Sequence, residues 1–283
     1  GDPRHCFPPD HCSTSCEATM STAANRLPIT MKTTFQDLLL LTYAVPPALL
    51  AAQLPAYIHP YVHHSTSYIS IVVGNMRGMR LGSLPEFLGT NYYQIVYRAV
   101  VCLRDLEGHE RIGVFFLRSD SNDPVMSYFG NRLTEFRFHY FHTGAIALFQ
   151  RDQELLVSVE TADRQGDLVA HLRNLGSADH FSPAPGFATV AEEKNTLVQL
   201  FHAYAYDPAR AVVYDLEIER GEWSLQRLEM QDSFSAFFQE HPFPAGLASP
   251  LSHIYIQECS YIWKPMVAIP VDTLQSDHHG EKI

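Results

Sequence analysis

Short strand-like segments, rich in β-branched and aromatic residues, follow one another closely through the middle of the chain. They cover residues 67–73, 91–104, 113–118, 136–148 and 155–160. A parallel pair of strands needs a crossover of a dozen or more residues, and most of these gaps are too short for one. The spacing therefore predicts a mainly β fold of the α+β kind. We expect a mostly antiparallel β-barrel or double sheet with a few flanking helices.

Four segments are interpreted as helical. Residues 34–41 predict a short helix, and the Pro46-Pro47 pair is typical of the first turn of a second one. A helical connection is expected at 122–133. A longer helix is predicted at 189–204, where apolar residues recur at helical spacing. We expect these helices to flank the sheet.

Two further segments carry information on strand placement. Residues 67–73 are apolar on both alternating faces, which indicates a strand in the middle of the structure. Residues 212–219 alternate between apolar and charged side chains, and Gly221 then separates them from a second strand at 223–230. This pattern predicts a β-hairpin.

Composition and charge restrict the classes of function. The formal net charge is -11 and there are only four lysines, which argues against binding to a nucleic acid backbone. The apolar run at 38–54 is interrupted by Thr42 and by two prolines, so we expect no membrane insertion. Five cysteines and no signal-like opening favour a reducing cytoplasm. Self-association into a homo-oligomer is left open.

The chain is interpreted as one domain at 31–272, preceded by an extension at 1–30 without apolar periodicity and followed by a loose tail at 273–283. The extension contains a cluster of potential zinc ligands: His5, Cys6, His11, Cys12 and Cys16. Their spacing lacks the paired C-x2-C knuckle of small zinc modules, so a disordered tail is preferred over a metal site.

The strand at 91–104 directs its polar residues to one face. Gln94 and Arg98 alternate there with Val96 and Val100, while Tyr97 lies on the opposite face. An arginine inside an apolar cavity would bind a carboxylate through two charge-assisted hydrogen bonds. The alternative is that Arg98 points to solvent and Tyr97 fills the core.

Three stretches resemble a known family, and they read NYYQIVYRAVVCLRD, GVFFLRSD and GNRLTEFRFHYFHTGAIAL. They are similar to the DUF2071 proteins, whose fold is that of acetoacetate decarboxylase. The resemblance extends to LLLLTYAVPPALLAAQLP near Leu38 and, more weakly, to HIYIQECSYIWKP. It implies the acetoacetate decarboxylase-like fold for most of the chain.

The same resemblance implies a loss of the decarboxylase chemistry. In acetoacetate decarboxylases, a lysine in the segment similar to GNRLTEFRFHYFH forms a Schiff base with the substrate, and the lysine positions here fall on Phe138 and His139. The relatives' Tyr-x-Glu reads Tyr92-Tyr93-Gln94, which replaces a carboxylate by an amide. Neither imidazole nor phenyl can form the iminium. Decarboxylation through a Schiff base is therefore not expected.

Three functional hypotheses remain. The first is a small-molecule-binding barrel for a carboxylate or carbonyl compound, with the binding residues Gln94, Arg98, Arg132, Arg137 and His139. The second is a lyase or hydrolase acting on a small organic acid through His139, His142 and Glu135. The third is a structural or interaction protein with a packed barrel, whose function lies on an exposed apolar surface.

No cofactor and no metal are expected. His139 and His142 are three apart and would point to opposite faces of a strand. The group His59, His63 and His64 is interpreted as solvated, because a metal site there would need a carboxylate from elsewhere in the chain. Lys264 is the alternative amine that could form a Schiff base. It is interpreted as the exposed end of a strand. The acidic residues at 163, 167, 192 and 193 are interpreted as a solvated face.

Overall fold

The computed structural model describes residues 29–133, 138–140, 146–240, 243 and 249–276. The strands are β1 (Met31–Val45), β2 (His59–Pro60), β3 (Ser67–Leu81), β4 (Thr90–Arg104), β5 (Glu110–Ser121), β6 (Phe138–Tyr140), β7 (Ile146–Arg151), β8 (Glu154–Val159), β9 (Leu168–Ser177), β10 (His202–Asp207), β11 (Val212–Arg220), β12 (Gln226–Ser235), β13 (Ser252–Trp263) and β14 (Val267–Pro270). The helices are α1 (Pro47–Ala51), η1 (Glu86–Leu88), α2 (Pro124–Leu133), η3 (Ala178–His180), α3 (Val190–Glu193), η4 (Lys194–Val198), α4 (Phe237–Glu240) and η6 (Val271–Thr273). The predicted mainly β fold is confirmed.

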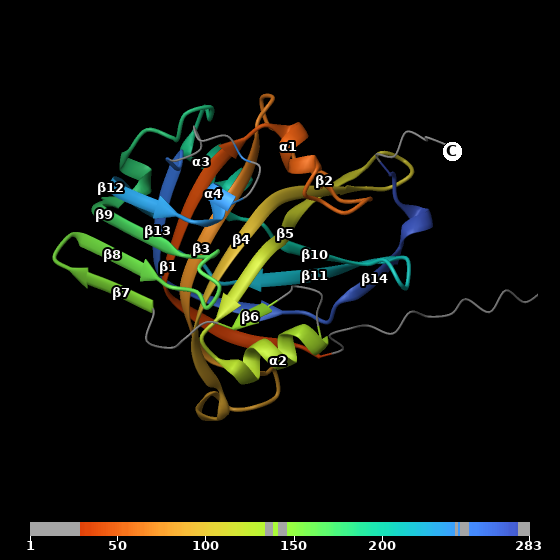
Figure 1. Ribbon diagram of the computed structural model, residues 1–283, viewed down its shortest axis with the longest axis horizontal. Helices are drawn as coiled ribbons and strands as arrows, with labels where there is room; N and C mark the ends of the chain where they lie inside the picture. The colour runs from red at the N-terminus through yellow and green to blue at the C-terminus, as the bar shows by residue number, and fades with distance from the viewer. Residues whose placement is uncertain (1–28, 134–137, 141–145, 241–242, 244–248, 277–283) are drawn as a thin grey trace, which may run out of the picture.

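The long strands pair in a circuit that returns to its starting point. The neighbours run in the order β11, β10, β5, β4, β3, β1 and β13, and β13 pairs again with β11. All of these pairings are antiparallel except that of β10 with β5. We call this circuit the ring. Beyond β13 the sheet continues through β12, β9 and β8 to β7, which lie together on one side of the molecule (Figure 1).

The central strands are apolar on both faces because each face packs into a different core. In β1, Leu39 and Leu41 belong to a core shared with β8, β9 and α4, whereas Leu38 and Leu40 belong to the core inside the ring. The helix predicted at 34–41 is therefore wrong. An apolar run that is buried on two sides fits a central strand as well as a buried helix, and periodicity cannot separate the two.

The predictions for the other helices are confirmed in part. Helix α1 begins at Pro47, and α2 lies within the predicted connection at 122–133. The helix predicted at 189–204 is wrong in its second half, because helical structure ends at Val198 and the chain enters β10 at His202. There Ala203 pairs with Val114 of β5, and this long-range pairing replaces a continued helix.

The hairpin predicted from 212–219 and 223–230 is also wrong. Strand β11 forms where expected and β12 only overlaps the second expected segment, but the two strands are not paired with each other. Strand β13 lies between them in the pairing order and bonds to both. Alternation along a strand determines which side chains share a face, but it does not determine the partner strand. The prediction of a central strand at 67–73 is confirmed, because β3 lies between β1 and β4.

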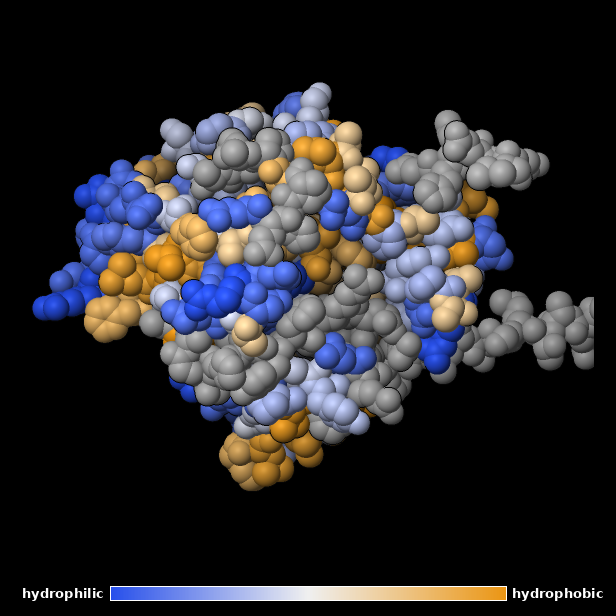
Figure 2. All heavy atoms as spheres, viewed as in Figure 1, coloured by the Kyte–Doolittle hydropathy of each residue, from blue (hydrophilic) through white to orange (hydrophobic). Residues whose placement is uncertain are grey.

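Some apolar side chains remain on the surface. Figure 2 shows hydrophobic atoms at the tip of the connection between β3 and β4, where the side chains of Phe87 and Leu88 are 83% and 57% exposed. A second area lies over β7–β9, where Phe149, Leu156 and Val169 are exposed. Within the described part of the chain, no helix is long and apolar enough to cross a membrane. The single-domain interpretation remains a prediction, and the expected N-terminal extension lies almost entirely outside the described residues.

Candidate functional site

A cavity lies inside the ring and is lined by side chains from all seven of its strands. Its volume is about 60 Å³. One water needs about 10 to 15 Å³ by this measure, so there is room for several waters or a small organic molecule. The apolar and aromatic lining consists of Phe35, Leu38, Leu40, Val72, Gly74, Val96, Val114, Phe116, Val198, Ala203, Leu216, Ile218, Trp223, Tyr261 and Trp263. The strongly polar lining residues are Gln94, Arg98 and Arg220.

Arg98 is directed into this cavity by the alternation of β4. Its neighbours Gln94 and Val96 line the same space, whereas Tyr97 packs in the other core, stacked on Phe237 at 4.3 Å between ring centroids. Only 7% of Arg98 is exposed. One terminal nitrogen donates to the carbonyl oxygen of Leu197 at 3.3 Å, and Nε has no hydrogen-bond partner. Arg98 therefore enters the interior with unused donors.

Arg220 is the second cation of the cavity and is held by main-chain and aromatic groups. It donates to the carbonyl oxygens of Val198, at 2.8 Å, and Leu200. Its guanidinium carbon lies 4.7 Å from the ring centroid of Tyr261 and 5.1 Å from that of Trp223. Such cation–π contacts stabilise a desolvated charge. Nε of Arg220 is also buried without a partner.

The two arginines give the cavity a positive charge that no described carboxylate neutralises. Neither Arg98 nor Arg220 forms an ion pair with a described residue, and no described Asp or Glu lines the cavity. Burial, followed by the charge of Arg220, lowers the pKa of Arg98 to about 10. Arg98 remains protonated at neutral pH, and keeping this charge buried costs free energy. The unneutralised positive charge and the cost of burying it both favour an anionic ligand in this space.

A surface depression leads towards the cavity. It is lined by Lys194, Gln199, Phe201 and Glu222, together with Arg220 and Trp223, which also line the cavity. Arg220 and Trp223 therefore lie between the interior space and the surface. The depression presents two basic side chains, Lys194 and Arg220, and one acidic side chain, Glu222.

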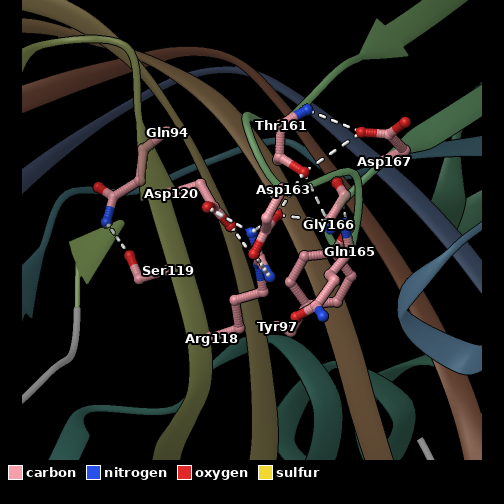
Figure 3. Close-up of polar contacts among 10 residues, drawn as sticks. All are labelled: Gln94, Tyr97, Arg118, Ser119, Asp120, Thr161, Asp163, Gln165, Gly166 and Asp167. Atoms are coloured by element: carbon pink, nitrogen blue, oxygen red, sulfur yellow. Dashed lines mark hydrogen bonds and ion pairs between the residues drawn. The ribbon is translucent and has the colours of Figure 1, made fainter. Parts of the chain in front are cut away.

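Gln94 lines the cavity beside Arg98, and its amide donates to the hydroxyl of buried Ser119 at 2.9 Å. An ionic network lies on the opposite face of β4 and β5 (Figure 3). Arg118 donates two hydrogen bonds to Asp120 and two to Asp163, at 2.6 to 2.9 Å. The Tyr97 hydroxyl donates to the carbonyl of Gly166 at 2.9 Å. This network attaches the loop after β8 to the sheet, and it does not line the cavity.

The interpretation of the four acidic residues as a solvated face is wrong for two of them. Glu193 is buried and accepts hydrogen bonds from Arg227 at 2.7 and 2.8 Å. Asp167 is buried and accepts from the Thr161 main-chain nitrogen at 2.7 Å. Asp167 pairs with a residue several positions away in sequence, and Glu193 pairs with one tens of positions away. The local pattern of charges carries no information on such partners.

The other predicted site residues lie where the side chain or the whole residue is outside the described part of the structure, so their roles stay predictions. Arg132 lies in α2 and His139 in β6, beside Asp120 of β5, but their side chains are not described. Arg137, His142 and Glu135 lie outside the described residues. Of the lysines, Lys264 forms ion pairs with Glu217 and Glu219, in agreement with its interpretation as an exposed strand end. No described lysine lines the cavity.

Sequence reasoning missed Arg220, although a signal for it existed. Leu216 and Ile218 point into the ring, and Arg220 follows two positions later on the same face of β11. The interpretation of the histidine group as solvated is wrong for His59, whose ring is buried and lies 3.1 Å from the carbonyl oxygen of Gln275. It is also wrong for His63, whose side chain is 13% exposed and lies 3.0 Å from the Glu192 carboxylate, whereas His64 is exposed.

The fold is similar to that of acetoacetate decarboxylase-like proteins. An acetoacetate decarboxylase-like enzyme from Sphingomonas wittichii RW1 matches with a TM-score of 0.56 at 12% identity, over 86% of this chain and 94% of that one. Acetoacetate decarboxylase from Legionella pneumophila matches with a TM-score of 0.57 at 12% identity, over 89% and 93%. The enduracididine biosynthesis enzyme MppR, complexed with pyruvate, matches with a TM-score of 0.54 at 11% identity, over 93% and 98%. No curated protein sequence matches the chain.

The family is shown by the sequence itself. The model of DUF2071, described as an uncharacterized conserved protein, matches residues 32–258. The chain therefore belongs to the DUF2071 family. The resemblance read from the sequence, and the acetoacetate decarboxylase-like fold that it implied, are both confirmed.

Proposed function

We propose that this protein binds a small organic carboxylate in the cavity of the ring, with Arg98 and Arg220 as the groups that hold the carboxylate. The observation that carries the proposal is a pair of arginines in the cavity lining, Arg98 buried and Arg220 half-buried, without a described carboxylate partner. A guanidinium presents parallel N–H donors that match the two oxygens of a carboxylate. The apolar walls would then contact the remainder of the ligand.

Two further observations support a small carboxylate. The cavity volume of about 60 Å³ suits a molecule of a few heavy atoms. MppR, which shares the fold, is complexed with pyruvate in one of its structures. A pyruvate-like 2-oxo acid is therefore the first probe to test. We propose binding without a Schiff base, and the lack of a lysine among the described lining residues supports this.

The test is isothermal titration calorimetry of the full chain with pyruvate, benzoate and acetate, each beside its neutral amide. Inorganic phosphate serves as a second anion. We expect carboxylates to bind and their amides not to bind. Removing one partner of a buried charged pair costs about 2 to 5 kcal/mol, so Arg98→Met and Arg220→Met should each weaken binding by roughly 30-fold or more.

A matched control comes from an arginine on the surface. Arg173 on β9 is half exposed and pairs with Glu229, away from the cavity lining, so Arg173→Met should leave the affinity unchanged. Equal carboxylate affinity in the wild type, Arg98→Met and Arg220→Met would refute the proposal. Binding of phosphate alone would also refute it, since the site would then select another anion.

A further inference from the structure

Two adjacent histidines and one glutamate, distant in sequence, converge beside the start of β3. His63 and His64 lie in the turn before β3, and Glu192 lies in α3, 129 positions after His63. One nitrogen of each imidazole and one oxygen of the carboxylate all lie within 4.8 Å of one another. We propose that these three residues form a binding site for a divalent transition-metal ion, with zinc as the ion of best fit.

The side chain of His63 is already held in place for this role. Its Nε2 lies 3.0 Å from Oε1 of Glu192, and its ring stacks on Phe187 with 5.1 Å between centroids. Only 13% of the His63 side chain is exposed. Its Nδ1 is buried and has no hydrogen-bond partner. The ligand atom that faces Glu192 is therefore Nε2, and an ion bound between the two side chains would take the place of the hydrogen bond that joins them.

The donor chemistry selects the class of ion. Neutral imidazole and carboxylate oxygen together suit zinc and its neighbours, whereas magnesium and calcium prefer sites made of oxygen alone. The Glu192 carboxylate is also held in place by a hydrogen bond from the main-chain nitrogen of Ala188 at 2.6 Å. Two histidines and one carboxylate would leave a fourth coordination position for water.

A second group of potential metal ligands lies close together for a local reason. Asp105, Glu107 and His109 also bring their ligand atoms within 4.8 Å of one another. All three lie in a single exposed turn between β4 and β5, where the main chain and the ring of His109 already bond to the Asp105 carboxylate. The local turn accounts for their closeness. The closeness of His63 and Glu192 instead depends on the tertiary structure.

Metal binding at this site would join the turn before β3 to the wall of the cavity. Helix α3 continues directly into η4, whose Leu197 and Val198 carbonyls accept hydrogen bonds from Arg98 and Arg220. An ion that binds only the folded state stabilises it. We therefore expect zinc to raise the melting temperature of the protein whether or not a carboxylate ligand is present.

The experiment must separate this site from the cysteines near the N-terminus. The parent protein is the full chain with Cys6→Ser, Cys12→Ser and Cys16→Ser, titrated with zinc chloride by calorimetry and followed by thermal unfolding. We expect one equivalent of zinc to bind and the melting temperature to rise, with no response to magnesium chloride. Loss of a ligand should weaken zinc binding by at least about tenfold, the lower end of the range for changes near a metal.

Two variants and one control decide the outcome. His64→Asn removes an imidazole at a residue whose φ is 46°, a conformation that asparagine adopts readily, so the fold is retained. Glu192→Gln removes the carboxylate charge. His171→Asn alters a histidine that also pairs with a glutamate, Glu154, and should bind zinc like the parent. Failure of the parent to bind zinc, or full zinc affinity in His64→Asn, would overturn the proposal.

Discussion

Replacing Arg98 by methionine should stabilise the ligand-free protein. Burial is the main reason that the pKa of Arg98 falls to about 10. Each tenfold change in an acid dissociation constant corresponds to about 1.4 kcal/mol, so the buried charge costs about 3 kcal/mol. Methionine is similar in length and carries no charge. It would lose the 3.3 Å hydrogen bond to Leu197, which contributes about 1 kcal/mol.

The expected net gain is about 2 kcal/mol in the free energy of unfolding, measured by urea denaturation without ligand. For a protein of this size, that gain raises the melting temperature by roughly 4 to 8 °C. A saturating carboxylate ligand should then stabilise the wild type and leave Arg98→Met unchanged. Arg173→Met, at an exposed pair, should alter stability by less than about 0.5 kcal/mol. A ligand-free Arg98→Met protein less stable than the wild type would refute the reasoning that Arg98 is an uncompensated buried charge.

Three further predictions concern the scaffold. Hydrogen bonds from Arg118 lower the pKa of Asp163 to about 2, so its contribution to stability is complete above a pH of about 4 and is lost as the pH falls towards 2. Asp163→Asn should therefore reduce the loss of stability between these two pH values. The difference in the free energy of unfolding should be less than about 1 kcal/mol, because Asp163 is partly exposed; an unchanged acid unfolding curve would contradict this. Glu193→Ala leaves the buried Arg227 without its partner and should cost about 3 to 5 kcal/mol in urea denaturation, whereas a cost below 1 kcal/mol would argue against the pair. Gly113→Ala would place Cβ 2.6 Å from a main-chain oxygen of β10 and should lower the free energy of unfolding by about 1 to 3 kcal/mol. An unchanged melting temperature would show that β5 and β10 can move apart to admit the methyl group.

The sequence carried more information about the fold than about the site. Closely spaced strand patterns predicted a mainly β fold, and the three stretches beginning at Asn91 led to the correct family. The alternation of β4 also placed Gln94 and Arg98 on one face, and both side chains line the cavity. These features follow from the chain locally, because successive side chains of a strand point to opposite faces whatever the partner strand is.

Only the tertiary structure decided which distant groups meet. Residues 34–41 form a strand because β3 and β13 bond to both of their edges. Strand β13 likewise separates β11 from β12. The meeting of Arg98 with Arg220, and of His63 with Glu192, depends on pairing and packing between segments more than a hundred positions apart. No local period encodes such contacts, because the free energy that forms them comes from burial and hydrogen bonding across the assembled sheet.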